Sequence, residues 1–140
     1  MKKLLITLLI LLSLEAYTQV TYSKDYLGNT VAKDQYGNII ATGSKDYLGN
    51  FVWKDKYGNV IQTESLDYMG NTVKKDQYGN TQSTQSTNYM GERVEKDQYG
   101  NIIFTISKDY MGNYVKKDKY GNVMGTYKKD YLGNWVYTPN

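Results

Sequence analysis

One internal period constrains this chain more than any other feature, because a 21-residue pattern recurs from Lys24 to the C-terminus without a single insertion. The copies span residues 24–44, 45–65, 66–86, 87–107 and 108–128, and a truncated copy spans 129–140. A short lead-in, Thr21-Tyr22-Ser23, matches the end of a copy. A unit of this length is one supersecondary element that buries its core only against neighbouring copies. We therefore expect residues 19–140 to form one tandem-repeat domain.

Two turn signals punctuate each copy, D-Y-(L/M)-G-N and D-(Q/K)-Y-G-N. The aspartate carboxylate can accept hydrogen bonds from backbone N–H groups ahead of it, and the glycine three residues later can adopt the left-handed conformation. This combination is typical of a three-residue hairpin loop with a G1 bulge. The turn-forming residues expected in the first two copies are Asp25, Gly28, Asp34, Gly37, Asp46, Gly49, Asp55 and Gly58.

The segments between the turns are short and rich in Val, Ile, Thr and Tyr, which predicts strands and an all-β fold. Two arrangements are open: an antiparallel meander forming a single twisted sheet, and a β-solenoid of stacked copies. Stacking in register would place like carboxylates, such as Asp34 and Asp55, about 4.8 Å apart, where repulsion in water is about 1 kcal/mol per pair. This favours the meander, although the adjoining lysines could neutralise the ladder and keep the solenoid open.

Alternation along the first strand of each copy assigns its two faces. One valine stripe is the same in all six copies and is predicted to be the buried face: Val31, Val52, Val73, Val94, Val115 and Val136. The flanking positions vary and are predicted to face outward, with Tyr26 and Tyr36 folded over the edges of the stripe. Five aromatic residues at the varied positions are the candidate ligand contacts: Phe51, Trp53, Tyr114, Trp135 and Tyr137. Flat rings suit a carbohydrate face or a protein, and the alternative is cross-strand pairing that stiffens the sheet.

The N-terminus has the pattern of a secretory signal peptide over residues 1–18. Lys2 and Lys3 precede an apolar run from Leu4 to Leu14, and Ala16 and Thr18 are the expected cleavage points. Because a spanning helix needs about twenty apolar residues, we expect a cleaved signal helix and no membrane span afterwards. The predicted location is outside the cell or on its surface, with the periplasm as a further option.

The chain has no histidine and no cysteine, which removes the usual proton shuttle, the thiolate nucleophile and the commonest zinc ligands. The remaining polar residues recur as copies of a structural unit, whereas catalysis needs one constellation unlike its surroundings. The aspartates lack the spacing of known calcium loops. Cleavage would leave 15 basic against 13 acidic residues, too small an imbalance for a nucleic-acid partner. We expect no enzyme activity, no cofactor and no metal site.

The repeated units Asp25-Tyr26-Leu27-Gly28-Asn29 and Asp34-Gln35-Tyr36-Gly37-Asn38 resemble the tyrosine-aspartate repeats of the YD/RHS family, over residues 24–140. That resemblance implies β-hairpins and a structural role in secreted or surface proteins. Here the tyrosine follows the aspartate, and no toxin domain is present. A looser, architectural likeness connects the chain to curli-type secreted fibre subunits, although their glutamine ladder is missing.

We therefore expect a secreted or surface-displayed bacterial β-repeat protein with a structural or adhesion-like binding role. The expected partner is an extracellular glycan or a protein. The alternative is a self-assembling fibre subunit of curli-like type, whose partner is a second copy. A meander would leave open strand edges at Thr18–Ser23 and Trp135–Asn140, and open edges invite association.

Overall fold

The computed structural model describes residues 18–140, and the predicted signal helix lies outside them except for Thr18. Twelve strands follow one another: β1 Val20–Lys24, β2 Thr30–Lys33, β3 Ile39–Lys45, β4 Phe51–Asp55, β5 Val60–Leu66, β6 Thr72–Lys75, β7 Thr81–Thr87, β8 Arg93–Asp97, β9 Ile102–Lys108, β10 Tyr114–Asp118, β11 Val123–Lys129 and β12 Trp135–Pro139. No α-helix occurs in this part of the chain. The all-β prediction is confirmed.

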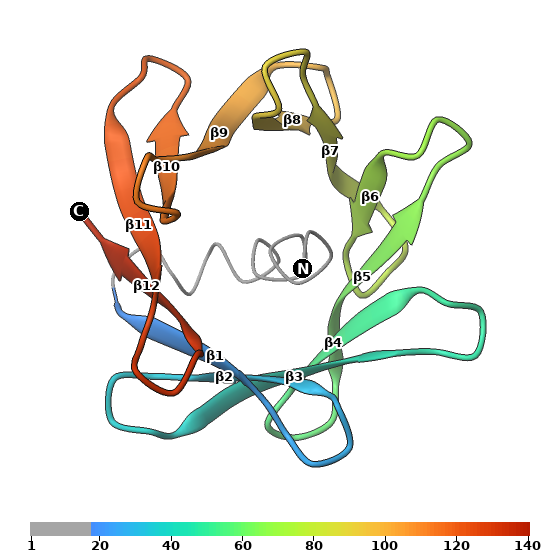
Figure 1. Cartoon of the computed structure of the whole chain (residues 1–140). Helices are drawn as coiled ribbons and strands as arrows, with labels where there is room; N and C mark the ends of the chain where they lie inside the picture. The colour runs from blue at the N-terminus through green and yellow to red at the C-terminus, as the bar shows by residue number, and fades with distance from the viewer. Residues whose placement is uncertain (1–17) are drawn as a thin grey trace.

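The strands form an antiparallel meander that closes into a barrel, with β1 paired to β12 (Figure 1). The meander prediction is therefore confirmed, but the single open sheet and the solenoid are both wrong. The open edges expected at the two ends of the domain are also wrong, because each covers the other. Closure satisfies the backbone groups that an open meander would leave exposed on its first and last strands.

The register of the closure follows from the repeat. Trp135 and Tyr137 of β12 pair with Tyr22 and Val20 of β1. Residues at the same positions of the 21-residue repeat pair with one another between β4 and β5. The N-terminal strand thus supplies the second strand of the truncated C-terminal copy, so the barrel contains six pairs of repeat strands.

The turns have the hydrogen bonding expected of the repeated aspartate and glycine. In the first turn, Gly28 N–H donates to the Asp25 carbonyl and Asp25 N–H donates to the Asn29 carbonyl, both at 3.0 Å. The Asp25 carboxylate accepts the N–H groups of Leu27 and Asn29 and the Asn29 side-chain amide. Gly28 has φ 85°, which an L side chain would strain. The structure places Asp34, Gly37, Asp46, Gly49, Asp55 and Gly58 in equivalent turns.

A bulge recurs in the second hairpin of each complete copy, where the pairing shifts between Ala32 and Lys33, Trp53 and Lys54, and at the three later equivalents. A β-bulge bends its strand and increases the local twist. Repeated at a fixed period, such bends curve the sheet in one direction. This curvature is the local device that brings β12 back to β1.

The valine stripe does not line the enclosed face. Thr30 and Ala32 are fully buried on the inside of the barrel, and Val31 between them lies on the outer face, although Val31 and Val94 are buried there with 7% exposure. Each of the first five valines sits between a serine and a threonine of the neighbouring strands, as Val52 does between Ser44 and Thr63. Tyr26 and Tyr36 also differ from expectation, because they project into solvent from the turns with exposures of 95% and 79%. The invariant residues therefore form the outer surface, and the varied residues form the interior.

Candidate functional site

The barrel interior is lined by two rings of side chains. The ring nearer the D-Y-(L/M)-G-N turns consists of Tyr22, Thr30, Gly43, Phe51, Glu64, Thr72, Gln85, Arg93, Ile106, Tyr114, Tyr127 and Trp135. The second ring consists of Val20, Ala32, Ala41, Trp53, Gln62, Lys74, Ser83, Glu95, Phe104, Lys116, Gly125 and Tyr137. Hairpin turns recur, but these interior positions differ from copy to copy. The interior is therefore where this chain has individual chemistry.

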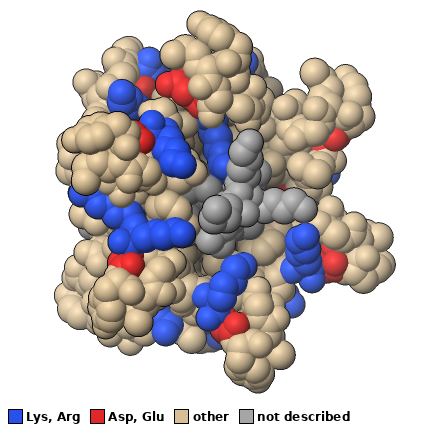
Figure 2. Space-filling view, in the orientation of Figure 1, with Lys and Arg blue, Asp and Glu red and all other residues tan. Residues whose placement is uncertain are grey.

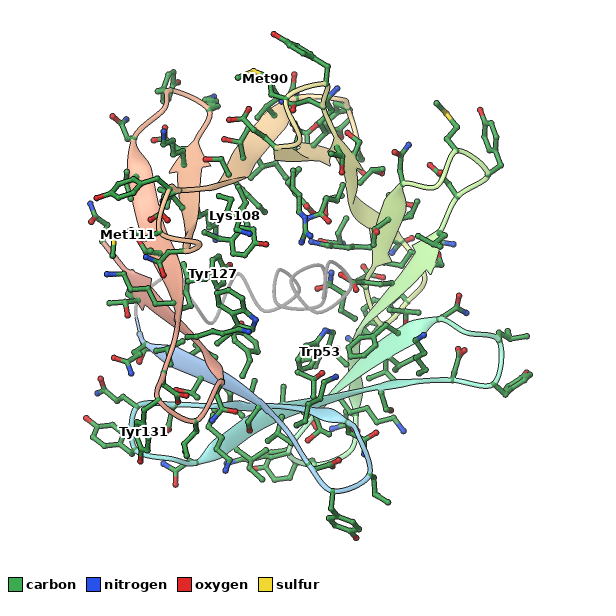
Figure 3. The ribbon with its side chains drawn as sticks, viewed as in Figure 1. Trp53, Met90, Lys108, Met111, Tyr127 and Tyr131 are labelled. Atoms are coloured by element: carbon green, nitrogen blue, oxygen red, sulfur yellow. The ribbon has the colours of Figure 1, made fainter. Side chains whose placement is uncertain are left out.

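Strands β9 to β12 and β1 to β4 form an arc of mostly apolar inward residues, here named the aromatic arc. Trp53 is fully buried and packs edge to face against Phe51, with ring centroids 5.5 Å apart, and against Tyr22 at 6.4 Å. Tyr127 and Tyr137 form a second pair at 4.7 Å. Trp53 and Tyr127 both point into the barrel in Figure 3. The Lys116 ammonium lies over the Phe104 and Tyr137 rings, at 4.8 and 5.3 Å from their centroids.

Two glycines inside the aromatic arc provide the room that its large rings occupy. A Cβ added to Gly43 would lie 2.6 Å from Phe51 Cζ, and one added to Gly125 would lie 2.6 Å from Tyr137 Cε2. The Tyr137 hydroxyl crosses Gly125 and donates to the Met124 carbonyl at 3.3 Å. Small and large residues therefore complement each other across neighbouring strands, as in a packed core.

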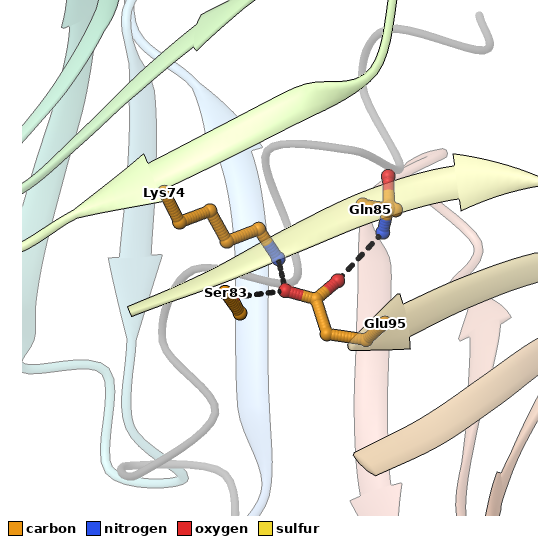
Figure 4. A network of polar contacts seen from close by, with 4 residues as sticks. All are labelled: Lys74, Ser83, Gln85 and Glu95. Carbon is orange, nitrogen blue, oxygen red and sulfur yellow. Dashed lines mark hydrogen bonds and ion pairs between the residues drawn. The ribbon is translucent and has the colours of Figure 1, made fainter. Parts of the chain in front are cut away.

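Strands β5 to β8 form the opposite wall, here named the polar arc, because all eight of their inward residues are polar: Gln62, Glu64, Thr72, Lys74, Ser83, Gln85, Arg93 and Glu95. Glu95 lies at its centre and is fully buried. One of its oxygens accepts the Ser83 hydroxyl at 2.5 Å and lies 2.9 Å from Lys74 Nζ, and the other accepts the Gln85 amide at 3.3 Å (Figure 4). These partners compensate the burial of the Glu95 charge.

Glu64 is the buried acid of the polar arc that lacks such partners. Its side chain is 4% exposed, and its Oε1 atom has no hydrogen-bond partner. Burial raises the pKa of the Glu64 carboxyl to about 8, with Lys74 opposing the rise and Glu95 adding to it. Glu64 therefore carries a proton at neutral pH and can donate as well as accept.

The rim above the first ring is basic. The inward register of β1 continues to Lys24, whose ammonium donates to Thr30 Oγ1 at 2.8 Å. Equivalent positions in other copies hold Lys45, Lys108 and Lys129. The pKa of Lys24 is lowered mainly by burial, with Asp25 opposing and Lys45 adding to the fall. Figure 2 shows basic side chains around the centre of the face that it draws. Two copies break this rim, with Leu66 and Thr87 in place of lysine.

A pocket of about 350 Å³ opens at this break in the rim, over the polar arc. Its wall contains Thr72, Gln85 and Thr87, with Arg93 and Lys108 as the cations and Tyr114 and Ile106 as the larger surfaces. None of the described residues that line it is acidic. Burial lowers the pKa of the Arg93 guanidinium, and Tyr114 opposes this fall. The pocket thus combines two cations, several neutral hydrogen-bonding groups and a ring face.

The five aromatic residues predicted as ligand contacts all lie inside the barrel rather than on its outside. Trp53 and Tyr137 are buried, and Phe51, Tyr114 and Trp135 are half-buried. Tyr114 is the one that lines the pocket. The cross-strand pairing weighed as the alternative is present, as in the edge-to-face contact of Tyr114 with Trp135 at 5.4 Å. A role in ligand contact stays a prediction.

Sequence reasoning missed the polar arc, although a signal was available. The third copy alone has a charged or polar residue at every varied interior position, the first strand of the fourth copy continues this pattern with Arg93 and Glu95, and these two copies alone lack the rim lysine. The fourth copy also exchanges its turn residues, with Asn88 donating to Glu92 where other copies have aspartate accepting from asparagine. Departures from a repeat mark a distinct site once the fold has brought them together.

Two negative findings concern the described residues. No group of three or more acidic side chains among residues 18–140 is placed to hold a metal ion. The same residues contain no helix suited to crossing a membrane.

Comparison with known proteins gives similarity of fold. No model of a protein family matches the chain, and no curated protein matches it. The X-ray structure of a protein from Arabidopsis thaliana superposes with a TM-score of 0.67 at 14% identity, covering 87% of this chain and 79% of that one. Alternansucrase in complex with isomaltononaose aligns at 18% identity, but with a TM-score of 0.22 over 12% of that chain, which supports no argument. The chain shares an overall fold with the Arabidopsis protein.

Proposed function

We propose that this chain is a secreted or surface-displayed binding barrel that takes a small polar molecule at the mouth of its polar arc and catalyses no reaction. One observation carries the proposal. The pocket of about 350 Å³ lies where the repeats depart from their common pattern. Its volume is at the lower end of the range for small-molecule sites. A stabilising core needs no such departure, because the aromatic arc packs with apolar residues.

The composition supports binding rather than catalysis. A chain without histidine or cysteine has few groups for proton transfer or nucleophilic attack at neutral pH. Glu95 is held by Ser83, Gln85 and Lys74, which fixes the floor of the polar arc. Rigid, satisfied polar groups suit a preorganised binding site.

The test is a thermal-shift screen of the full chain against a library of polar metabolites, followed by calorimetry on the hits. A ligand that binds only the folded state raises the melting temperature with its concentration. Thr87→Trp should fill the pocket and abolish the shift. Lys45→Trp is the matched control, because it places the same side chain at the equivalent rim position two copies away. A library without hits, or equal loss in both variants, would contradict the proposal.

Self-assembly is the second candidate, and a different observation favours it. The five D-Y-(L/M)-G-N turns and the equivalent turn of the fourth copy carry tyrosines that are 95–98% exposed and leucines or methionines that are 66–70% exposed. Met90, Met111 and Tyr131 mark three of these tips in Figure 3. Tyrosine and methionine are enriched at protein–protein interfaces, which favours contacts with a second copy through these tips. Because β1 covers β12, assembly would proceed through these tips rather than through strand edges.

Light scattering of the full chain over rising concentration tests this candidate. Assembly that disappears when Leu27, Met69 and Met111 are replaced by Ser, with the barrel intact by circular dichroism, would support it. A monomer at every concentration would exclude it.

A further inference from the structure

We infer that the ligand of the pocket is a hydroxylated carboxylate of monosaccharide size, a sugar acid, anchored by Arg93 and Lys108. This inference rests on the proposed function and names its ligand class. The first step is charge. The described lining contains two cations, Arg93 and Lys108, and no acidic side chain. Such a lining favours an anionic ligand, because a cation would be repelled by both groups.

Arg93 selects the kind of anion. It comes from the first interior ring, where its inward position on β8 is opposite Ile106 of β9. Its guanidinium is partly withdrawn from solvent, as the fall of its pKa through burial indicates. A planar guanidinium in such surroundings matches a carboxylate with two parallel hydrogen bonds, and the interaction strengthens as water is excluded.

The neutral wall adds a requirement for hydroxyl groups. The Gln85 amide nitrogen donates to Glu95, which orients the Gln85 carbonyl oxygen as an acceptor for a ligand donor. Thr72 and Thr87 supply hydroxyls that both donate and accept. Tyr114 and Ile106 give the pocket an apolar surface, and the carbon face of a sugar ring packs against such a surface.

The rim explains how an anion reaches the pocket. Lys24, Lys45 and Lys129 stand at the inward rim positions of the first, second and sixth copies, and the pocket opens beside Thr87, which replaces the rim lysine of the fourth copy. Clustered charges of one sign around an opening raise the local concentration of the opposite ion. The Lys24 ammonium already donates a hydrogen bond to Thr30, so it contributes to the positive electrostatic potential at the opening and makes no direct contact in the pocket.

The test compares glucuronate with glucose by calorimetry on the full chain, because the two sugars differ in the carboxylate alone. Glucuronate should bind about tenfold or more tightly than glucose, and the difference should shrink as salt is raised. Arg93→Gln should remove the preference. Lys108→Gln, at an exposed position that leaves the fold intact, should weaken glucuronate by about threefold or more. Lys54→Gln, a lysine on the outer face, is the matched control and should have no effect.

Each remaining outcome overturns the inference. Equal affinities for glucose and glucuronate would show that the site does not recognise the carboxylate, although the pocket would still be a binding site. Equal binding of acetate and glucuronate would reduce the site to an anion site without sugar recognition. Binding of neither sugar would exclude sugar acids, while a hit from the metabolite screen that Thr87→Trp abolishes would preserve the proposed function.

Discussion

Replacing Glu64 by glutamine tests whether the interior holds a neutral carboxylic acid. In the folded chain the Glu64 carboxyl has a pKa of about 8, against an ordinary value of 4.5, because it is buried without a hydrogen-bond partner for Oε1. Between these two values the folded state keeps a proton that the unfolded chain releases. The free energy of unfolding must therefore fall as pH rises through this window, and flatten above it.

The magnitude follows from the size of the shift. At about 1.4 kcal/mol per pH unit, the rise in pKa corresponds to a loss of about 5 kcal/mol of stability between about pH 5 and pH 9. Glutamine has nearly the same shape and no proton to lose. The variant should be free of this loss, so its stability relative to the natural chain should increase by about 5 kcal/mol across the same range.

Urea unfolding at several pH values, followed by tyrosine and tryptophan fluorescence, measures the effect. The chain suits the experiment because it has no histidine or cysteine to titrate in this window. Glu92→Gln makes the same substitution in a surface turn and should leave the pH dependence unchanged. Parallel curves for the natural chain and Glu64→Gln would refute the reasoning, because Glu64 would then be ionised in both states.

Three further predictions concern the turns, the packing and the closure. Asn88→Asp should lower the free energy of unfolding by about 1 kcal/mol, because the introduced carboxylate would face the Glu92 carboxylate. Adding Glu92→Asn should restore the lost stability by recreating the common turn. Denaturant unfolding of the single and double variants measures both effects. Non-additivity of the pair is the required result. Gly125→Ala should cost about 1–3 kcal/mol because its Cβ would overlap the Tyr137 ring, and Tyr137→Leu in the same chain should recover part of that loss; a neutral single variant would contradict the packing. A circular permutant that joins Asn140 to Thr18 through Tyr-Gly-Asn completes the sixth copy and should unfold at the same urea concentration as the natural domain. Deletion of Val20–Lys24 should instead expose the edge of β12 and cause aggregation.

Local sequence determined the hairpins. Asp25 and Gly28, and their copies, specify their turn through atoms within five residues of one another, so reading the chain in short windows finds every turn and strand. The exact period also explains the register of the closure that the structure shows. The lead-in Thr21-Tyr22-Ser23 matches the end of a copy, and its pairing with β12 repeats a register found elsewhere in the chain.

The choice of faces illustrates where sequence reasoning fails. A repeated residue such as Val52 suggests a core, because cores of ordinary domains tolerate little change. In a closed ring of six copies, however, each interior position meets different neighbours from the other arc, and the interior gains its packing from differences between copies. Trp53 fits because Gly43 lies beside it, and Lys74 fits because Glu95 lies opposite.

By itself the sequence determined the all-β class, the turns and the 21-residue period, because these depend on residues close together in the chain, and it favoured the antiparallel meander without excluding the solenoid. Only the tertiary structure decided that the sheet closes, which face is enclosed and that Arg93, Lys108 and Tyr114 share one pocket. Closure depends on small bends added over twelve strands, and alternation marks two faces without saying which is concave. The curvature of the sheet therefore decides which residues share the site, and this curvature cannot be predicted from any short segment of the sequence.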